Sequence, residues 1–97
     1  MNLSNQMKDE NMLLEKYIGA NVFIRTVITY FTGRLVEIDE KFIRLQTAAW
    51  IADTGRFHNA LKNSTFDEVE PYVNDVLVSI ASIIDVTTID VLPTAQK

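Results

Sequence analysis

The sequence predicts a mainly β fold: a small, strongly bent antiparallel barrel of five strands preceded by an N-terminal α-helix. From residue 21 onward, β-branched and aromatic residues dominate and recur at alternate positions, which is the period of a strand. Gly33 interrupts one of these runs, and a glycine inside a strand run usually marks a sharp bend. The chain has 97 residues, of which 47% are hydrophobic and 23% charged, so we predict a single domain over residues 1–97.

The helix is predicted over residues 4–17. Its apolar residues recur near three and four positions apart, and they are Met7, Leu14, Tyr17 and Ile18. Ser4 can cap the first turn and Gly19 can end the last one. Because charged residues are mixed into the first sixteen positions, we expect no signal sequence, no membrane partner and a cytoplasmic protein.

The next residues predict three strands. The first covers residues 22–30, with Thr26 interrupting one of its faces. The second and third are predicted over residues 35–38 and 42–49, joined by a tight charged turn at Asp39. A sheet with few strands needs a bend such as the one at Gly33 to curl around its own core.

Residues 51–74 lose the strand pattern, and we interpret them as an enlarged loop between the third and fourth strands. Phe57, Ala60 and Leu61 share the side of one or two possible helical turns. Acidic residues follow at positions 67, 68 and 70. The segment is a candidate surface for a protein partner.

Residues 76–92 carry the most informative signal. Eleven of these seventeen residues are apolar, none is lysine, arginine or proline, and the break most compatible with two strands lies at Ala81 and Ser82. Exposed edge strands are normally protected by the residue types that this run lacks. We therefore expect these strands to pair with an identical subunit. A head-to-tail contact of that kind gives a closed ring or an open filament, and the ring is favoured for a protein of this size.

Composition limits the chemistry. The chain has no cysteine and one histidine, so we predict no metal site and no cofactor. The net charge is -4, with eight bases and seven acids in residues 1–62 but six acids and one base in residues 63–97. Any phosphate-binding surface is therefore expected outside the C-terminal third taken as a whole.

The order of elements, with a glycine in the second strand and an aspartate in the following turn, resembles the Sm-like family, which includes Sm, LSm and Hfq proteins. The motif that carries the resemblance runs from Gly33 through Leu35, Ile38 and Asp39 to Leu45. The family's asparagine reader of uridine corresponds to Ile43 here, and its arginine-glycine or lysine-histidine segment corresponds to residues 78–80. The resemblance therefore implies the scaffold more strongly than the RNA pocket.

By resemblance, the RNA-binding positions lie in the turn between the second and third strands and in the fourth strand. They are Asp39, Glu40, Lys41, Ser79 and Ile80. The implied function is a non-catalytic homo-oligomeric ring that binds single-stranded RNA as a chaperone or scaffold. The alternative is a ring without RNA binding that engages a protein partner through residues 51–74.

Two further patterns have simpler interpretations. The sequence Asp53-Thr54-Gly55 matches the aspartic protease tripeptide, but a plain Asp-Gly turn is favoured because no other glycine is suitably placed for that fold. Tyr30, Phe31 and Phe42 are assigned to the core or a subunit interface in preference to a base-stacking platform.

Overall fold

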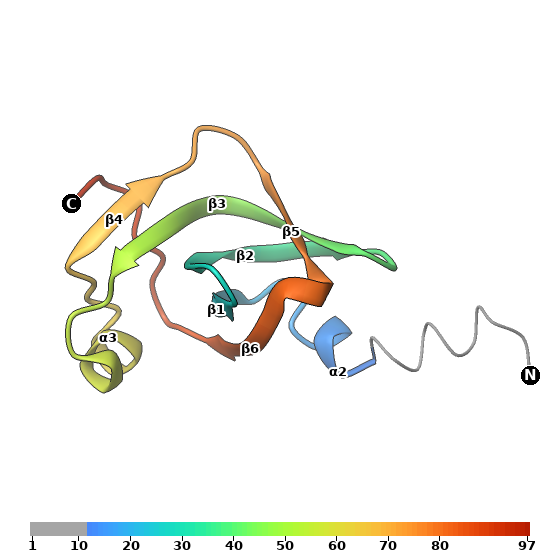
Figure 1. The fold of residues 1–97 in the computed structure, drawn as a ribbon, viewed down its shortest axis with the longest axis horizontal. Helices are drawn as coiled ribbons and strands as arrows, with labels where there is room; N and C mark the ends of the chain where they lie inside the picture. Colours follow the sequence, from blue (N-terminus) through green and yellow to red (C-terminus); the bar gives the residue numbers. More distant parts are fainter. Residues whose placement is uncertain (1–11) are drawn as a thin grey trace, which may run out of the picture.

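The computed structural model describes residues 12–97 as a curled antiparallel sheet with short helices (Figure 1). The strands are β1 (Asn21–Thr26), β2 (Tyr30–Ile38), β3 (Phe42–Asp53), β4 (Glu68–Pro71), β5 (Val76–Ser79) and β6 (Ile83–Thr88). The helical segments are α2 (Met12–Glu15), α3 (Phe57–Asn63) and the 3-10 turn η1 (Ile80–Ser82). No helix in this range is long and apolar enough to cross a membrane.

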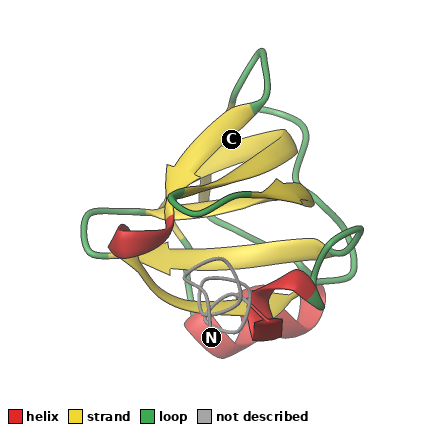
Figure 2. Cartoon of the chain, turned by 90° about the vertical axis from the view of Figure 1, so that its right-hand side faces the viewer, coloured by secondary structure: helices red, strands yellow, loops and turns green. Residues whose placement is uncertain are grey.

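The sheet runs in the order β4-β3-β2-β1-β6, and β5 also pairs with β3. β4 pairs with the end of β3, where Trp50 faces Glu70, whereas β5 pairs with its beginning, where Ile43 faces Val78. The two short strands therefore share one strand position, interrupted at residues 72–75. The antiparallel architecture is confirmed, but the sheet has six strands where five were predicted, because β4 is additional. Figure 2 shows the strands curling around to two sides of the molecule.

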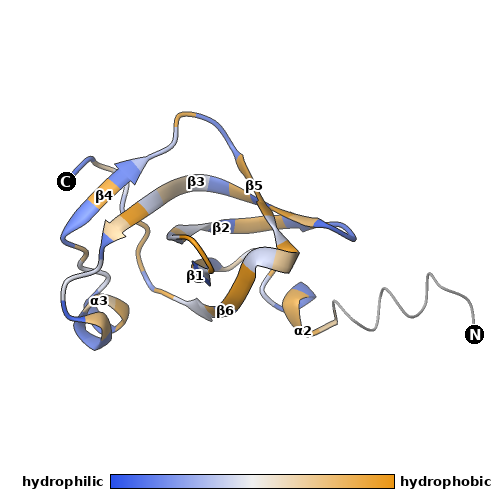
Figure 3. Cartoon of the chain, viewed as in Figure 1, coloured by the Kyte–Doolittle hydropathy of each residue, from blue (hydrophilic) through white to orange (hydrophobic). Residues whose placement is uncertain are grey.

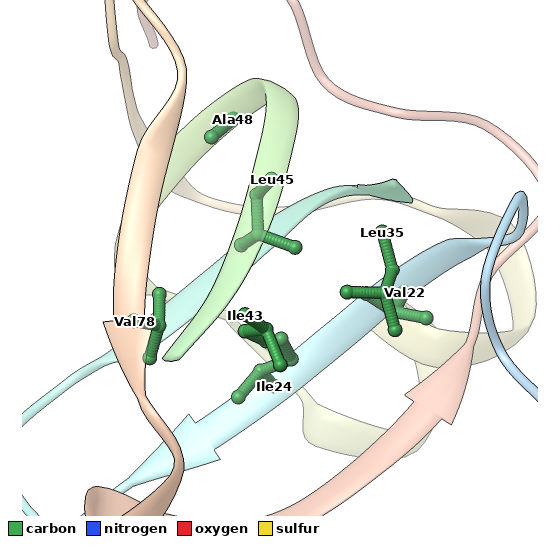
Figure 4. Packing of buried hydrophobic residues seen from close by; sticks show 7 residues of the cluster. All are labelled: Val22, Ile24, Leu35, Ile43, Leu45, Ala48 and Val78. Atoms are coloured by element: carbon green, nitrogen blue, oxygen red, sulfur yellow. The ribbon is translucent and has the colours of Figure 1, made fainter. Parts of the chain in front are cut away.

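The first hydrophobic core lies inside the curl. Its buried members are Val22, Ile24, Leu35, Ile43, Leu45, Ala48 and Val78 (Figure 4). A Cβ at Gly33 would lie 2.9 Å from the Cβ of Leu45, so close approach of β2 to β3 explains this glycine. The pairing register of β2 with β3 also shifts here, between Thr32 and Arg34.

A second core lies on the opposite face of β1, because Phe23 points away from its neighbours Val22 and Ile24. Its buried residues are Phe23, Ala49, Ile51, Ala60, Phe66, Val69 and Ile89. The rings of Phe23 and Phe66 stack with centroids 5.8 Å apart. This core joins the sheet to α3 and to the C-terminal segment, and it was not predicted from the sequence.

The enlarged loop predicted over residues 51–74 is wrong in its boundaries. β3 continues to Asp53, and β4 occupies four residues inside the predicted loop. Thr47 has a positive φ of 51°, and this irregularity shifts the strand's alternation, so that Leu45 and Ala48, three residues apart, are buried in the same core. The segment between the two strands is residues 54–67, which contains α3.

Two other boundaries also differ from the prediction. The first predicted strand is divided at residues 27–29, because the Thr26 hydroxyl donates to the Thr29 carbonyl (2.6 Å) and accepts from the Thr29 amide (3.0 Å) to form a turn. The predicted helix over residues 4–17 ends at Glu15, and residues 4–11 lie outside the described range. Leu14 and Tyr17 pack against the first core. The break predicted at Ala81 is present as η1.

Candidate nucleic-acid interface

The turn between β2 and β3 is built around the Asp39 carboxylate. Its Oδ1 accepts hydrogen bonds from the backbone amides of Phe42 (2.7 Å) and Lys41 (2.8 Å). These two bonds stabilise the charged form and hold the pKa of Asp39 below its ordinary value, the Phe42 bond being the larger cause. Asp39 thus shapes the turn that presents Glu40 and Lys41, both of which are exposed.

The structure brings together the candidate residues from the two distant parts of the sequence. The amide of Ile80 donates to the carbonyl of Lys41 (2.8 Å), and Ser79 is the cross-strand partner of Phe42. Ser79 and Ile80 are half-buried, and the Ser79 carbonyl accepts a hydrogen bond from Ser82 (2.7 Å). All five sequence-predicted site positions therefore lie at one end of the sheet, which Figure 3 colours hydrophilic at the turn.

Charge at this end is mixed. Arg44 donates to Glu37 (2.8 Å) and lies 3.9 Å from Asp75, so its guanidinium is engaged by two carboxylates. Lys41 is the base among the five candidate residues. A strand of nucleic acid at this surface would find a phosphate contact at Lys41, but with acidic neighbours on either side of the turn.

Phe42 is a residue that the sequence interpretation did not assign to the site. Its side chain is 39% exposed and lines a shallow pocket together with Leu77 and Arg44. The signal was present in the alternation of β3, because Ile43 and Leu45 point into the first core and Phe42 must therefore point outward. An exposed ring beside Lys41 is what base stacking requires.

The other sequence patterns have structural explanations. The Asp53 carboxylate accepts the Gly55 amide (2.8 Å), and Gly55 has a positive φ of 67°, so this tripeptide forms the favoured Asp-Gly turn. His58 is exposed on α3. Within residues 12–97, no group of three or more histidine, aspartate or glutamate side chains is arranged to hold a metal ion.

The strands β5 and β6 are each paired on one side within the described chain, β5 with β3 and β6 with β1. Their apolar side chains Leu77 and Ile84 are 54% and 57% exposed. Asp85 is the one charge in β6, and Arg25 holds its pKa below the ordinary value by hydrogen bonding to both carboxylate oxygens. These two edges are therefore open within residues 12–97, each carries an exposed apolar side chain, and the charge of β6 is paired.

No protein-family model matches the chain, and neither does any curated protein sequence. Among solved structures, the chain is similar to a heptameric archaeal Sm protein, with a TM-score of 0.58 and 16% sequence identity. The match covers 81% of this chain and 98% of that one. The chain has the Sm-like fold. This confirms the predicted fold class.

Proposed function

We propose that the protein is a non-catalytic, homo-oligomeric ring in which β5 of one subunit pairs with β6 of the next. The open edges of these two strands carry the proposal. An unprotected edge favours pairing with another chain, and one copy offers two different edges. The contact is then head to tail and closes into a ring when the rotation between subunits permits it. The similar archaeal Sm protein is heptameric, which supports this assembly.

In this proposal, single-stranded RNA binds to the ring surface formed by the turn at Asp39, Glu40 and Lys41 together with Ser79 and Ile80. Lys41 contacts phosphate and Phe42 offers a ring for stacking. One such site is weak because acidic residues surround it. Repetition around a ring compensates, since several weak sites at fixed spacing bind one strand far better than a single site does.

Assembly is tested by measuring absolute mass in solution for Ile84→Lys. A charge at this open edge should oppose pairing, so we expect the variant to shift from oligomer to monomer. Leu13→Lys is the matched control, because Leu13 is also apolar and exposed but lies on α2, outside the sheet. A monomeric wild-type protein at high concentration rejects the ring.

RNA binding is tested by titrating U-rich and A-rich oligonucleotides across a range of salt concentrations. We expect Lys41→Gln to weaken binding and to reduce its salt dependence, because a phosphate contact is lost. Lys62→Gln removes the same charge from an exposed position on α3 and should leave binding unchanged. Equal effects of the two substitutions would reject the proposed surface.

A second candidate function is a ring that binds a protein partner and does not bind RNA. The specific observation in its favour is the charge around the turn, where Glu37, Asp39 and Glu40 are opposed by Lys41. This balance disfavours phosphate. An oligomer that is indifferent to both oligonucleotides would support this second function.

A further inference from the structure

An aromatic and acidic row crosses three strands at the opposite end of β3 from the candidate RNA surface. Trp50 of β3 is the direct partner of Phe31 in β2 and of Glu70 in β4, so the three side chains lie on one face of the sheet. Tyr72 follows β4, and its ring stacks on Phe31 with centroids 6.2 Å apart. The indole N–H of Trp50 donates to the Thr29 hydroxyl, which fixes the ring's orientation.

This row is accessible in the described chain. Trp50 and Tyr72 are 43% and 44% exposed, although aromatic side chains usually bury most of their surface. Val73, next to Tyr72 in the sequence, is almost fully exposed. The row thus offers two exposed aromatic rings and a carboxylate.

The charge around the row selects a cation. Glu68 and Glu70 lie on β4, and the sole base in residues 63–97 is Lys97, whose backbone pairs with Val69 between these two glutamates. Aromatic faces attract guanidinium and ammonium groups, and a carboxylate beside them adds a charge-assisted hydrogen bond. Phosphate would be repelled by the same carboxylates.

The β4 edge also accepts an extended segment of polypeptide, as the chain's own C-terminal residues demonstrate. Val69 and Lys97 exchange two backbone hydrogen bonds (2.9 and 3.0 Å). The side-chain amide of Gln96 donates to both oxygens of Glu70 (3.1 and 3.4 Å). Figure 1 shows the C-terminus beside β4. The Glu70 carboxylate thus accepts hydrogen bonds from the neutral amide of Gln96. A cationic donor on a bound segment would form a stronger hydrogen bond with the same carboxylate.

We propose that Phe31, Trp50, Glu70 and Tyr72 form a recognition site for a basic segment of a protein partner, with an arginine over the aromatic rings and bonded to Glu70. This inference rests on the second proposed function and deepens it by naming the surface and the chemistry of the partner. An apolar residue beside the arginine would contact Val73. The site uses one subunit and does not require a ring.

Trp50 makes the test direct because it is the single tryptophan of the chain. The full-length protein is titrated with a synthetic peptide of alternating arginine and valine while tryptophan fluorescence is recorded. We expect a saturable change that weakens with salt, and no change with a matched peptide in which glutamine replaces arginine. Glu70→Gln should lower the affinity about fivefold, the loss of one exposed charge-assisted contact. Asp90→Asn removes the same charge away from the row and should leave the affinity unchanged.

Three results with the peptides would overturn the proposal: no saturable change, equal binding of the glutamine peptide, or equal effects of Glu70→Gln and Asp90→Asn. Tighter binding of a U-rich oligonucleotide than of the arginine peptide at this tryptophan would also overturn it, since the occupant would then be nucleic acid. Circular dichroism checks that each variant is folded. The mass of the protein in solution is measured on the same samples. If the protein is a monomer and still binds the arginine peptide, the proposed ring is wrong and the proposed recognition site stands.

Discussion

The two cores differ in how far apart in sequence their residues lie. The first core draws mainly on β1, β2 and the beginning of β3, where alternate residues point inward. The second core combines Phe23 of β1 with Ala60 of α3, Phe66 of the following segment and Ile89 near the C-terminus. Because β1 contributes side chains to both cores, we expect the two cores to fold and unfold together. Curling the sheet buries one face, and the segment after β3 buries the other.

The largest expected effect breaks the second core. Phe66→Ala removes a fully buried ring that stacks on Phe23, so we expect unfolding free energy to fall by about 3–5 kcal/mol. Because β1 belongs to both cores, the loss should appear as one cooperative transition in urea, followed by both far-UV circular dichroism and Trp50 fluorescence.

Phe57→Ala is the control for this experiment. Phe57 lies on α3 and meets Phe23 edge to face, but it is partly exposed, so truncation should cost about 1 kcal/mol or less. If Phe66→Ala produced two separated transitions, with the sheet signal unchanged, the second core would be an independent unit and the comparison between the cores would be wrong.

The difference between the cores also explains what the sequence could predict. The first core follows from local alternation, and the run of residues 76–92 with its break at Ala81 needed no information beyond the run itself. β4 escaped prediction because its sequence, Glu-Val-Glu-Pro, contains one buried apolar residue between two acids, followed by a proline. Its strand conformation comes from pairing with β3 on one side and with Lys97 on the other.

The two candidate sites also differ in whether the sequence could predict them. Asp39, Lys41 and Ile80 were grouped by resemblance to a known scaffold, and the hydrogen bond between Lys41 and Ile80 unites them. The row of Trp50 and Glu70 depends on strand pairing within a segment that lacks a local strand pattern. No spacing in the sequence indicates it, because the residues meet only across the sheet.

A smaller loss of stability is expected when glycine is replaced by alanine, and Gly33 and Gly55 allow the two regions to be compared. At Gly33, an added Cβ meets the Leu45 Cβ at 2.9 Å and the Gln46 carbonyl at 3.3 Å, and neither atom can move without shifting β3. We expect Gly33→Ala to cost about 2–3 kcal/mol from overpacking. At Gly55, the neighbour is the Asp67 carboxylate, a flexible side chain, and the remaining cost of about 1 kcal/mol comes from the positive φ.

Urea denaturation of both alanine variants measures this order. A cost at Gly55 equal to or greater than that at Gly33 would contradict the assignment of Gly33 to close strand packing. It would also show that the Asp67 side chain cannot move aside to make room for a Cβ at Gly55.

The smallest expected effect tests how the C-terminal segment holds the second core. Lys97→Pro removes the amide that donates to the Val69 carbonyl, whereas Lys97→Ala keeps it, so the proline variant should be less stable by about 1 kcal/mol than the alanine variant. The Val69 amide donates to Lys97, and its hydrogen exchange should accelerate in the proline variant while the amide of Ile43, in the first core, keeps its rate. Equal acceleration at both amides would mean that the C-terminal segment stabilises the whole sheet and not the second core in particular. The two amides therefore distinguish two ways of exposing Val69 to exchange. Local opening at β4 accelerates Val69 alone, whereas global unfolding accelerates both amides because β1 carries residues of both cores.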